Sequence, residues 1–424
     1  MSRRLSSLLL VGLVAALALV GGCGDSATGG GADGESGGAV RTVHVVLPLD
    51  QDGDDIRDWR AAMELAVEEF GSRSDRVRVE AVFSNDSQPD GEEDPARAGA
   101  EARVAVADQR ALAMVGPASS SAAAVAAPIL NRAGMLQVLM SSTAVSLTMR
   151  SDVGSGPPAD IAPTGRRTIV RIVPNDRVQA RALLDYLKEE GIKRVTIVDD
   201  GGRFGTGLAA DIVSFSRGRS PAVSRGGTSD RAGVAALARR LALQNVGRQG
   251  RWALLMAVND QEMAVNAAKA IQQVDSSSVI AGPDSLTFRG FLTGVGAFER
   301  NAYVTTFQLP LQYYGPDGDR VSAALEQRLG HAPAAGSLFS YEAMALAISS
   351  IDKAYAKKGF PERPLAAQRR AVTNVALQTT DRGSVIGTYS ITATGDTSST
   401  LFGAYRVEDG TLVRGRAVDT GDIQ

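Results

Sequence analysis

The sequence predicts an α/β fold with two units of similar size. Apolar, β-rich runs alternate along the chain with segments whose apolar residues recur at helical spacing. A Gly/Pro-rich stretch at residues 150–167 separates one such series from a second. The chain has 424 residues, 44% of them hydrophobic, which is enough for two packed cores. This alternation indicates parallel sheets covered by helices on both faces.

The first series begins with a β-rich run at residues 42–49 and a helix at 58–71 that a glycine closes. A second strand is predicted at 76–83, followed by an alanine-rich helix. The buried runs at 111–116 and 135–140 supply two more strands.

The second series repeats this pattern. Strands are predicted at 168–176, 193–200, 251–258, 277–284 and 301–310, helices at 180–191, 205–216, 262–274 and 338–359, and a hairpin within 387–413.

The N-terminus has the composition of an export signal. Arg3 and Arg4 precede an apolar run from Leu8 to Val20. This run is shorter than the roughly 20 residues that span a bilayer. We therefore expect residues 1–22 to be removed.

Cys23 is the only cysteine, and it follows the apolar run in the stretch VGGC. This stretch resembles the lipobox of bacterial lipoproteins, in which the cysteine becomes the lipidated first residue; an incidental buried cysteine is the alternative. Residues 23–41 are rich in Gly and Ser, which predicts a flexible tether. The expected location is the extracytoplasmic face of the cell membrane, reached through a lipid anchor.

Composition argues against several functional classes. The formal net charge of −2 gives no basic excess to attract a phosphate backbone, so no nucleic-acid partner is predicted. With one cysteine and two histidines, His44 and His331, an intrachain disulfide is impossible and a Cys/His metal site is improbable. We predict no metal and no cofactor.

Seven stretches in order carry a resemblance to a known family: VVLPL, VGPASSSAAAVAAPILNRAG with SSTA, RIVPNDRVQARALLDYL, VTIVDDGGRFGTGLAADI, AGPDSL, SYEAMALAISSIDKA and GTYSITATGD. Over residues 42–413 the chain resembles the type I periplasmic binding proteins, in particular the leucine/isoleucine/valine-binding branch that serves ABC importers. The resemblance implies two doubly wound lobes joined by three hinge crossings, with a ligand cleft between them. Lobe 1 would comprise residues 42–173 and 309–384, and lobe 2 residues 174–308 and 385–424.

The resemblance implies that first-lobe hydroxyls and amides bind a ligand carboxylate. Ser120, in GPASSSA, matches the hydroxyl contact. Helix chemistry supports this placement independently, because a helix N-terminus offers unpaired N–H groups and a partial positive charge to an anion. Alternatively, Ser119 to Ser121 only cap the helix; with three serines, both readings can hold.

Four further residues are predicted to contact the ligand. In SSTA, the resemblance implies that Ser141 binds through its backbone and Thr143 through its hydroxyl, although a plain strand-to-helix turn would also use them. Asp284 stands where the family has its ammonium-binding acid, the alternative being a solvated loop aspartate. Phe204 replaces the usual tyrosine. The acidic loop at 50–58 and the segment at 259–260 lack the aromatic residues common in relatives.

Motifs for other chemistry are incomplete. The segment at 205–210 fits G-x-G-x-x-A, but GGRF separates it from the strand. The loop DQDGDD has its glycine at the fourth position of a calcium loop instead of the sixth. No G-x-S-x-G motif follows a predicted strand, as a nucleophile elbow requires. We therefore predict that the protein is not an enzyme.

These observations predict a lipid-anchored solute-binding protein of an ABC importer. It would bind an amino acid of the branched-chain type, or a related small polar ligand, by cleft closure, and ABC permease subunits would be its partners. The alternative is a regulatory or interaction lipoprotein of the same fold with a degenerate pocket.

Overall fold

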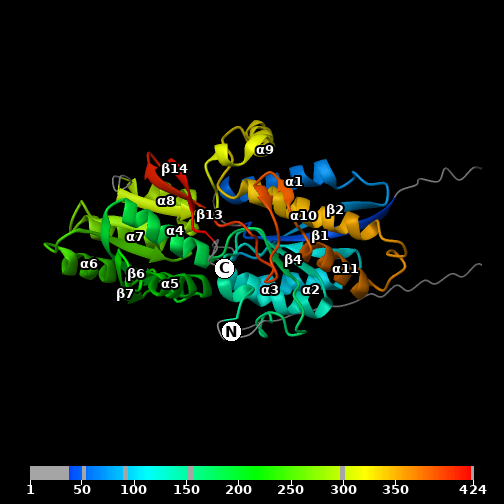
Figure 1. The fold of residues 1–424 in the computed structure, drawn as a ribbon, viewed down its shortest axis with the longest axis horizontal. Helices are drawn as coiled ribbons and strands as arrows, with labels where there is room; N and C mark the ends of the chain where they lie inside the picture. Colours follow the sequence, from blue (N-terminus) through cyan, green and yellow to red (C-terminus); the bar gives the residue numbers. More distant parts are fainter. Residues whose placement is uncertain (1–37, 50–53, 89–93, 151–155, 297–300, 422–424) are drawn as a thin grey trace, which may run out of the picture. The chain divides into compact units, whose positions relative to one another are not determined.

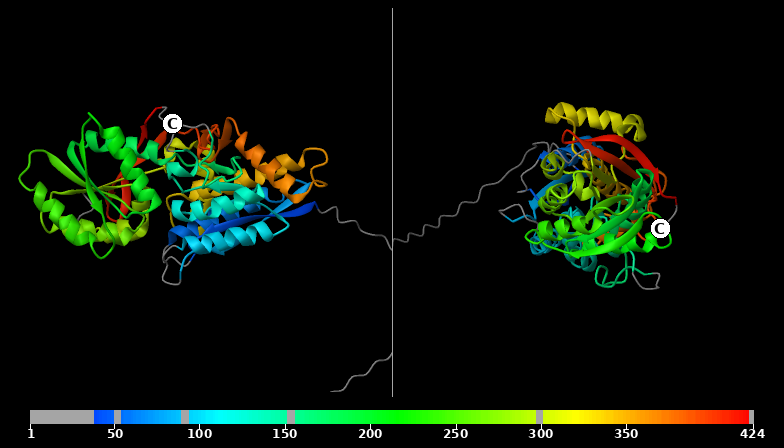
Figure 2. Two further views of the ribbon diagram at one scale, coloured as in Figure 1. Left: turned by 90° about the horizontal axis from the view of Figure 1, so that it is seen from below. Right: turned by 90° about the vertical axis from the view of Figure 1, so that its left-hand side faces the viewer.

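The structure, a computed structural model, describes residues 38–49, 54–88, 94–150, 156–296 and 301–421. The predicted signal peptide, Cys23 and most of the predicted tether lie outside these residues. In the described part of the chain, two sheets with helices on both faces form two lobes (Figures 1 and 2). No helix among these residues has the length and apolar character needed to cross a membrane.

The first sheet is entirely parallel, as predicted, and its strand order is β2-β1-β3-β4-β5. The strands are β1 (Ala39–Leu47), β2 (Val77–Asn85), β3 (Ala111–Val115), β4 (Leu136–Leu139) and β5 (Ile169–Arg171). The central strands β3 and β4 are buried along their whole length. Their continuous apolar sequence therefore reflects cover on both faces.

Helices cover the two faces of the first sheet (Figure 1). One face carries α1 (Asp54–Phe70), α10 (Ser337–Tyr355) and α11 (Leu365–Leu377), and the other carries α2 (Pro95–Ala107) and α3 (Ser120–Ala133). Helix α9 (Gly315–Leu329) packs on α1. Its sequence and that of α11 had no predicted element.

The second sheet has the order β14-β13-β10-β9-β8-β6-β7. Five strands are parallel, whereas β13 and β14 form an antiparallel hairpin at one edge. The strands are β6 (Ile192–Asp199), β7 (Ala222–Thr228), β8 (Arg251–Ala257), β9 (Val279–Gly282), β10 (Ala302–Thr306), β13 (Leu401–Glu408) and β14 (Thr411–Asp419). Strand β7 had no prediction because it is a largely exposed edge strand with two glycines and no apolar run.

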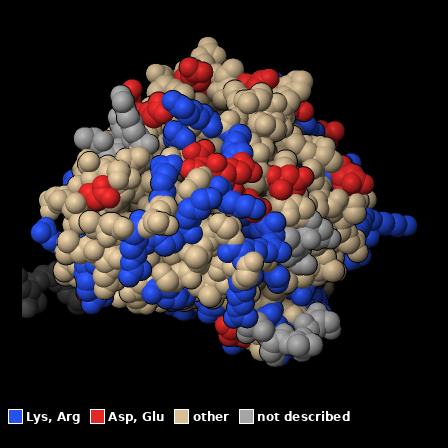
Figure 3. All heavy atoms as spheres, turned by 60° about the vertical axis from the view of Figure 1, so that its left-hand side comes forward, with Lys and Arg blue, Asp and Glu red and all other residues tan. Residues whose placement is uncertain are grey.

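Helices α4 (Asp176–Glu189) and α5 (Arg203–Ser216) pack against each other over one face of the second sheet. On the other face lie α6 (Val234–Asn245), α7 (Gln261–Gln272) and α8 (Arg289–Gly294). Acidic and basic side chains are interspersed on the surface shown in Figure 3. Charged side chains at the surface also form ion pairs, as Arg416 does with Glu189.

The chain passes between the lobes three times. It leaves the first lobe after β5, returns after β10, and leaves again after the short hairpin of β11 (Arg382–Ser384) and β12 (Gly387–Tyr389). The predicted fold class is confirmed. Strand order reverses between β1 and β3 in one sheet and between β6 and β8 in the other, so the loops beyond the carboxyl ends of these strands diverge and leave room for a ligand.

Candidate ligand-binding site

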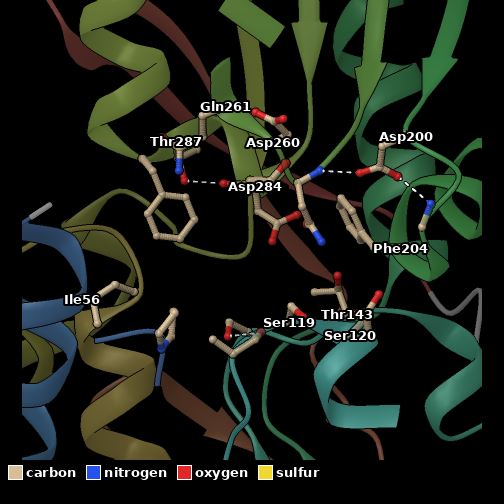
Figure 4. Close-up of a pocket in the computed structure, with 18 of the residues that line it drawn as sticks. Ile56, Ser119, Ser120, Thr143, Asp200, Phe204, Asp260, Gln261, Asp284 and Thr287 are labelled. Carbon is tan, nitrogen blue, oxygen red and sulfur yellow. Dashed lines mark hydrogen bonds between the residues drawn. The ribbon is translucent and has the colours of Figure 1, made fainter. Parts of the chain in front are cut away.

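A cavity of about 570 Å³ lies between the two lobes at the carboxyl ends of their central strands. Its volume is typical of small-molecule sites, which span roughly 300–1,000 Å³. Asp260, Asp284 and Phe204 of the second lobe face Ser120 and Thr143 of the first across this space (Figure 4). Lining residues include Pro48, Ile56, Trp59, Ser119, Ser120, Ser121, Ser141, Thr143, Phe204, Asn259, Gln261, Asp284, Ser285, Thr287, Phe288 and Phe307.

The first-lobe wall begins at the N-terminus of α3. Gly116 has φ +92°, and a Cβ there would lie 2.5 Å from the Val46 carbonyl oxygen, so only glycine fits this approach to β1. Ser119 is the N-cap, and its hydroxyl accepts a hydrogen bond from Ala122 N at 3.2 Å. The N–H groups of Ser120 and Ser121 start the helix and have no intrahelical acceptor.

Serine hydroxyls join this helix start to the turn after β4. Ser141 Oγ donates to the Ala118 carbonyl at 2.8 Å, and Ser120 Oγ accepts from Ala144 N at 3.1 Å. Because Ser120 acts as acceptor in that bond, its own O–H remains to donate to a ligand. The two turns therefore form one polar wall.

Thr143 is held by Asp176, the first residue of α4. The Thr143 carbonyl accepts from Asp176 N at 3.0 Å, and both carboxyl oxygens of Asp176 are buried without a hydrogen-bond partner among the described residues. Burial, reinforced by the Asp284 and Asp211 carboxylates, raises the pKa of Asp176 well above its ordinary value. The backbone bond to Asp176 positions Thr143, whose hydroxyl can donate to a ligand acceptor.

Asp284 supplies the opposite, acidic wall. It follows β9 at the start of a short 3-10 helix (Asp284–Thr287) and is 9% exposed. Its Oδ1 is buried without a hydrogen-bond partner among the described residues. Burial raises the pKa of Asp284 to about 6, and the neighbouring Gln179 amide opposes the shift. A buried carboxyl with an unused acceptor favours a cationic group in the cavity.

Aromatic rings form the remaining walls. Trp59, on α1, lies against Phe288, with ring centroids 5.5 Å apart, and its Nε1 donates to the Ala335 carbonyl at 2.6 Å. Ile56 lies on the opposite side of the cavity from Thr143 (Figure 4). The cavity therefore has a polar end at Thr143 and an apolar end at Ile56 and Trp59.

Other acids at the cavity are engaged within the protein. Asp200 accepts from Gly202 N and from Asn259 N, both at 2.9 Å, and so ties the loop after β6 to the loop after β8. Asp260 pairs with Arg231. These contacts leave Asp284 as the lining acid with an unused buried oxygen among the described residues.

Comparison with known proteins assigns the family. The sequence profile of the periplasmic binding protein family matches residues 50–411. The chain belongs to the periplasmic binding protein family. No curated protein sequence matches it significantly.

Three solved structures illustrate the same fold. This periplasmic binding protein is similar to an ABC transporter substrate-binding protein from Desulfitobacterium hafniense in complex with leucine, at 17% identity and TM-score 0.70, over 89% of this chain and 100% of that one. It is similar to a leucine binding protein from Thermotoga maritima, at 17% identity and TM-score 0.73, over 89% and 99%. A solute binding protein from Rhodopseudomonas palustris in complex with benzoate has 15% identity and TM-score 0.69, over 88% and 95%.

The five residues predicted from the sequence of this periplasmic binding protein line one cavity: Ser120, Ser141, Thr143, Phe204 and Asp284. Their contacts with a ligand remain predictions. Among the described residues, no group of three or more His, Cys, Asp or Glu side chains is arranged to hold a metal ion.

Sequence reasoning missed the aromatic residues. Trp59 follows the acidic loop directly, and Phe288 comes four residues after Asp284, so neither lies in the loop at 50–58 or the segment at 259–260, where relatives commonly have an aromatic residue. Phe307 enters from the second crossing, immediately after β10. Trp59 is signalled in the sequence by its place directly after the acidic loop, whereas Phe307 reaches the cavity only through the fold.

Proposed function

We propose that this protein is an extracytoplasmic solute-binding protein of an ABC importer, and that it binds an amino acid or a close relative by cleft closure. The proposal rests on one observation: hydrogen-bond donors and a buried acid face each other across one cavity. Hydrogen-bond donors at the start of α3 and at Thr143 face the buried acid Asp284. This arrangement suits a ligand with a carboxylate at one point and an ammonium group at another.

Each end of such a ligand has a physical reason for its place. The carboxylate would accept from the Ser120 and Ser121 N–H groups, where the helix dipole favours an anion. The ammonium would donate to Asp284, and a charge-assisted hydrogen bond of this kind contributes about 1.5–3 kcal/mol. An apolar side chain, of the branched-chain type or larger, would lie towards Trp59 and Phe288.

Two of the similar structures hold leucine and benzoate, which share a carboxylate and an apolar group and differ in the ammonium. Asp284 supports the amino acid for this chain, because an aromatic acid would leave the buried carboxyl without a partner. The alternative, a regulatory lipoprotein with a degenerate pocket, has no comparable support, since the cavity and its polar wall are intact.

Closure would involve residues 42–173 with 309–384 moving against residues 174–308 with 385–424. A ligand that contacts both lobes lowers the free energy of the closed state, and permease subunits would recognise that state. We further propose that Cys23 carries the lipid anchor after removal of residues 1–22. Cys23→Ser should then release the protein from the membrane fraction, and a variant that stays membrane-bound would contradict the anchor.

The decisive experiment is a thermal-shift screen of the chain from residue 24 onward against amino acids, amides, polyamines and small carboxylates. An amino acid at 100 times its Kd should stabilise the fold by about 2.7 kcal/mol. If no compound in the screen stabilises the protein, solute binding fails and the regulatory alternative gains support.

A further inference from the structure

A buried ion pair joins two of the three interlobe crossings. Arg171 ends β5, where the first crossing begins, and Asp396 lies in the third crossing, between β12 and β13. Arg171 is 0% exposed and Asp396 1%. Arg171 Nε donates to Asp396 Oδ1 at 2.8 Å, and Nη2 lies 2.6 Å from the same oxygen. The two crossings are also bridged by Arg171 N, which donates to the Gly395 carbonyl at 2.8 Å.

The guanidinium of Arg171 donates four hydrogen bonds, of which the one from Nε goes to Asp396. One Nη2 proton goes to Thr148 Oγ1 at 2.7 Å. The two Nη1 protons go to the carbonyl oxygens of Ser142 and Ala144, at 3.3 and 2.8 Å. A lysine has its three donors on one nitrogen and cannot span these acceptors.

The two carbonyls held by Nη1 flank Thr143, whose side chain lines the cavity. Ala144 N is in turn held by Ser120 Oγ. Arg171 therefore fixes the backbone on both sides of a predicted ligand contact without lining the cavity itself.

We propose that Arg171 and Asp396 are positioning residues that shape the turn Ser142–Ala144 for ligand binding and couple this turn to the first and third crossings. The rigid guanidinium of Arg171 contacts both crossings and the turn, so a change in the geometry of the crossings on closure shifts the backbone around Thr143. The effect on affinity rests on the proposed function, whereas the effect on the order of the turn does not.

Arg369 on α11 provides a matched control. It is 4% exposed, and its guanidinium also donates hydrogen bonds to backbone carbonyls, those of Ala111, Val106 and Asp108, at 2.9–3.0 Å. It lies in the same lobe but contacts neither the turn nor a crossing. Arg171→Lys and Arg369→Lys should therefore lower the free energy of unfolding by similar amounts, although each loosens a different part of the lobe.

The experiment compares both variants with the parent, from residue 24 onward, by hydrogen–deuterium exchange of the ligand-free proteins. Arg171→Lys should speed exchange at residues 141–148 and 390–400 by about tenfold, because the charged hydrogen bonds that hold both segments are lost. Arg369→Lys should leave these segments unchanged and affect residues 105–111. Unchanged exchange at 141–148 in Arg171→Lys, or equal loosening there by both variants, would overturn the proposal.

Affinity supplies the second readout, with L-leucine as the probe in calorimetry. Arg171→Lys should weaken binding by about tenfold or more, whereas Arg369→Lys should keep the parent Kd.

If Arg171→Lys does not fold, Thr148→Val, which removes the hydroxyl between Arg171 and Asp396, should give the same two effects more weakly. If the exchange result holds while the parent binds no compound in the screen, the proposed function fails and the structural coupling stands; normal affinity in a variant with a loosened turn would refute the positioning role.

Discussion

The indole of Trp59 lies against the ring of Phe288, with centroids 5.5 Å apart and planes inclined by 51°, although the two residues belong to different lobes. A second contact lies beside this one, since Arg289 N donates to Asp55 Oδ2 at 3.0 Å. The apolar end of the cavity is therefore bounded by a contact that must change whenever the lobes move relative to each other. An aromatic pair of this kind contributes roughly 0.5–1.5 kcal/mol beyond area burial.

This contact makes Trp59 an intrinsic reporter of ligand binding. The chain has two tryptophans, and the other, Trp252, is buried in the second lobe with its Nε1 bonded to Thr196. Ligand addition should change the fluorescence of the Trp252→Phe variant as it does that of the parent. The Trp59→Phe variant should show no change, and a response carried by Trp252 alone would contradict the placement of the site.

Asp284→Asn should remove most of the ligand-induced stabilisation. The amide keeps the shape of the side chain but loses the charge, so affinity for a ligand with an ammonium group should fall by about ten- to a hundredfold. Thermal shift and calorimetry measure the loss. Asp211→Asn is the control, because Asp211 is a half-buried acid of the second lobe whose pKa is likewise raised by burial to about 6, yet it does not line the cavity. Parent-like affinity in Asp284→Asn would remove Asp284 from the site.

The raised pKa of Asp284 predicts opposite pH trends for stability and for binding. In the ligand-free protein, Asp284 is protonated in both the folded and the unfolded state below pH 3.8. Between pH 3.8 and about 6 it ionises in the unfolded state while the folded state still holds the proton. The free energy of unfolding therefore falls as pH rises through this range. Denaturant titrations should show this decline, and Asp284→Asn should reduce it. An ammonium ligand instead needs the ionised form, so its affinity should fall by about tenfold per unit as pH drops below about 6. A flat affinity profile from pH 5 to 7 would show that the ligand does not bind the Asp284 carboxylate.

The sequence predicted those strands and helices that the pattern of apolar residues marks locally. The buried runs of β3 and β4 were predicted from their continuous apolar residues, and the helices α4, α5 and α10 from their apolar spacing. Strand β7 was missed because an exposed edge strand needs no apolar run. The polar wall was predicted because its serines follow strands directly, whereas the guanidinium network of Arg171 joins residues more than 200 positions apart and has no local signal.

The last prediction separates ligand contact from structural support at the polar wall. Ser120 and Ser142 are both buried serines whose hydroxyls bridge the turns after β3 and β4: Ser120 Oγ accepts from Ala144 N, and Ser142 Oγ donates to the Pro117 carbonyl at 3.0 Å. Ser120→Ala and Ser142→Ala should each lower the free energy of unfolding by about 1–3 kcal/mol, because each leaves a buried partner unsatisfied. Only Ser120 lines the cavity. Ser120→Ala should therefore also weaken ligand binding, by about tenfold, while Ser142→Ala should keep most of the affinity once the measurement is made well below its melting temperature. Equal losses of affinity in the two variants would mean that Ser120 acts only through the turns, and that the α3 N–H groups and Thr143 carry the carboxylate contact.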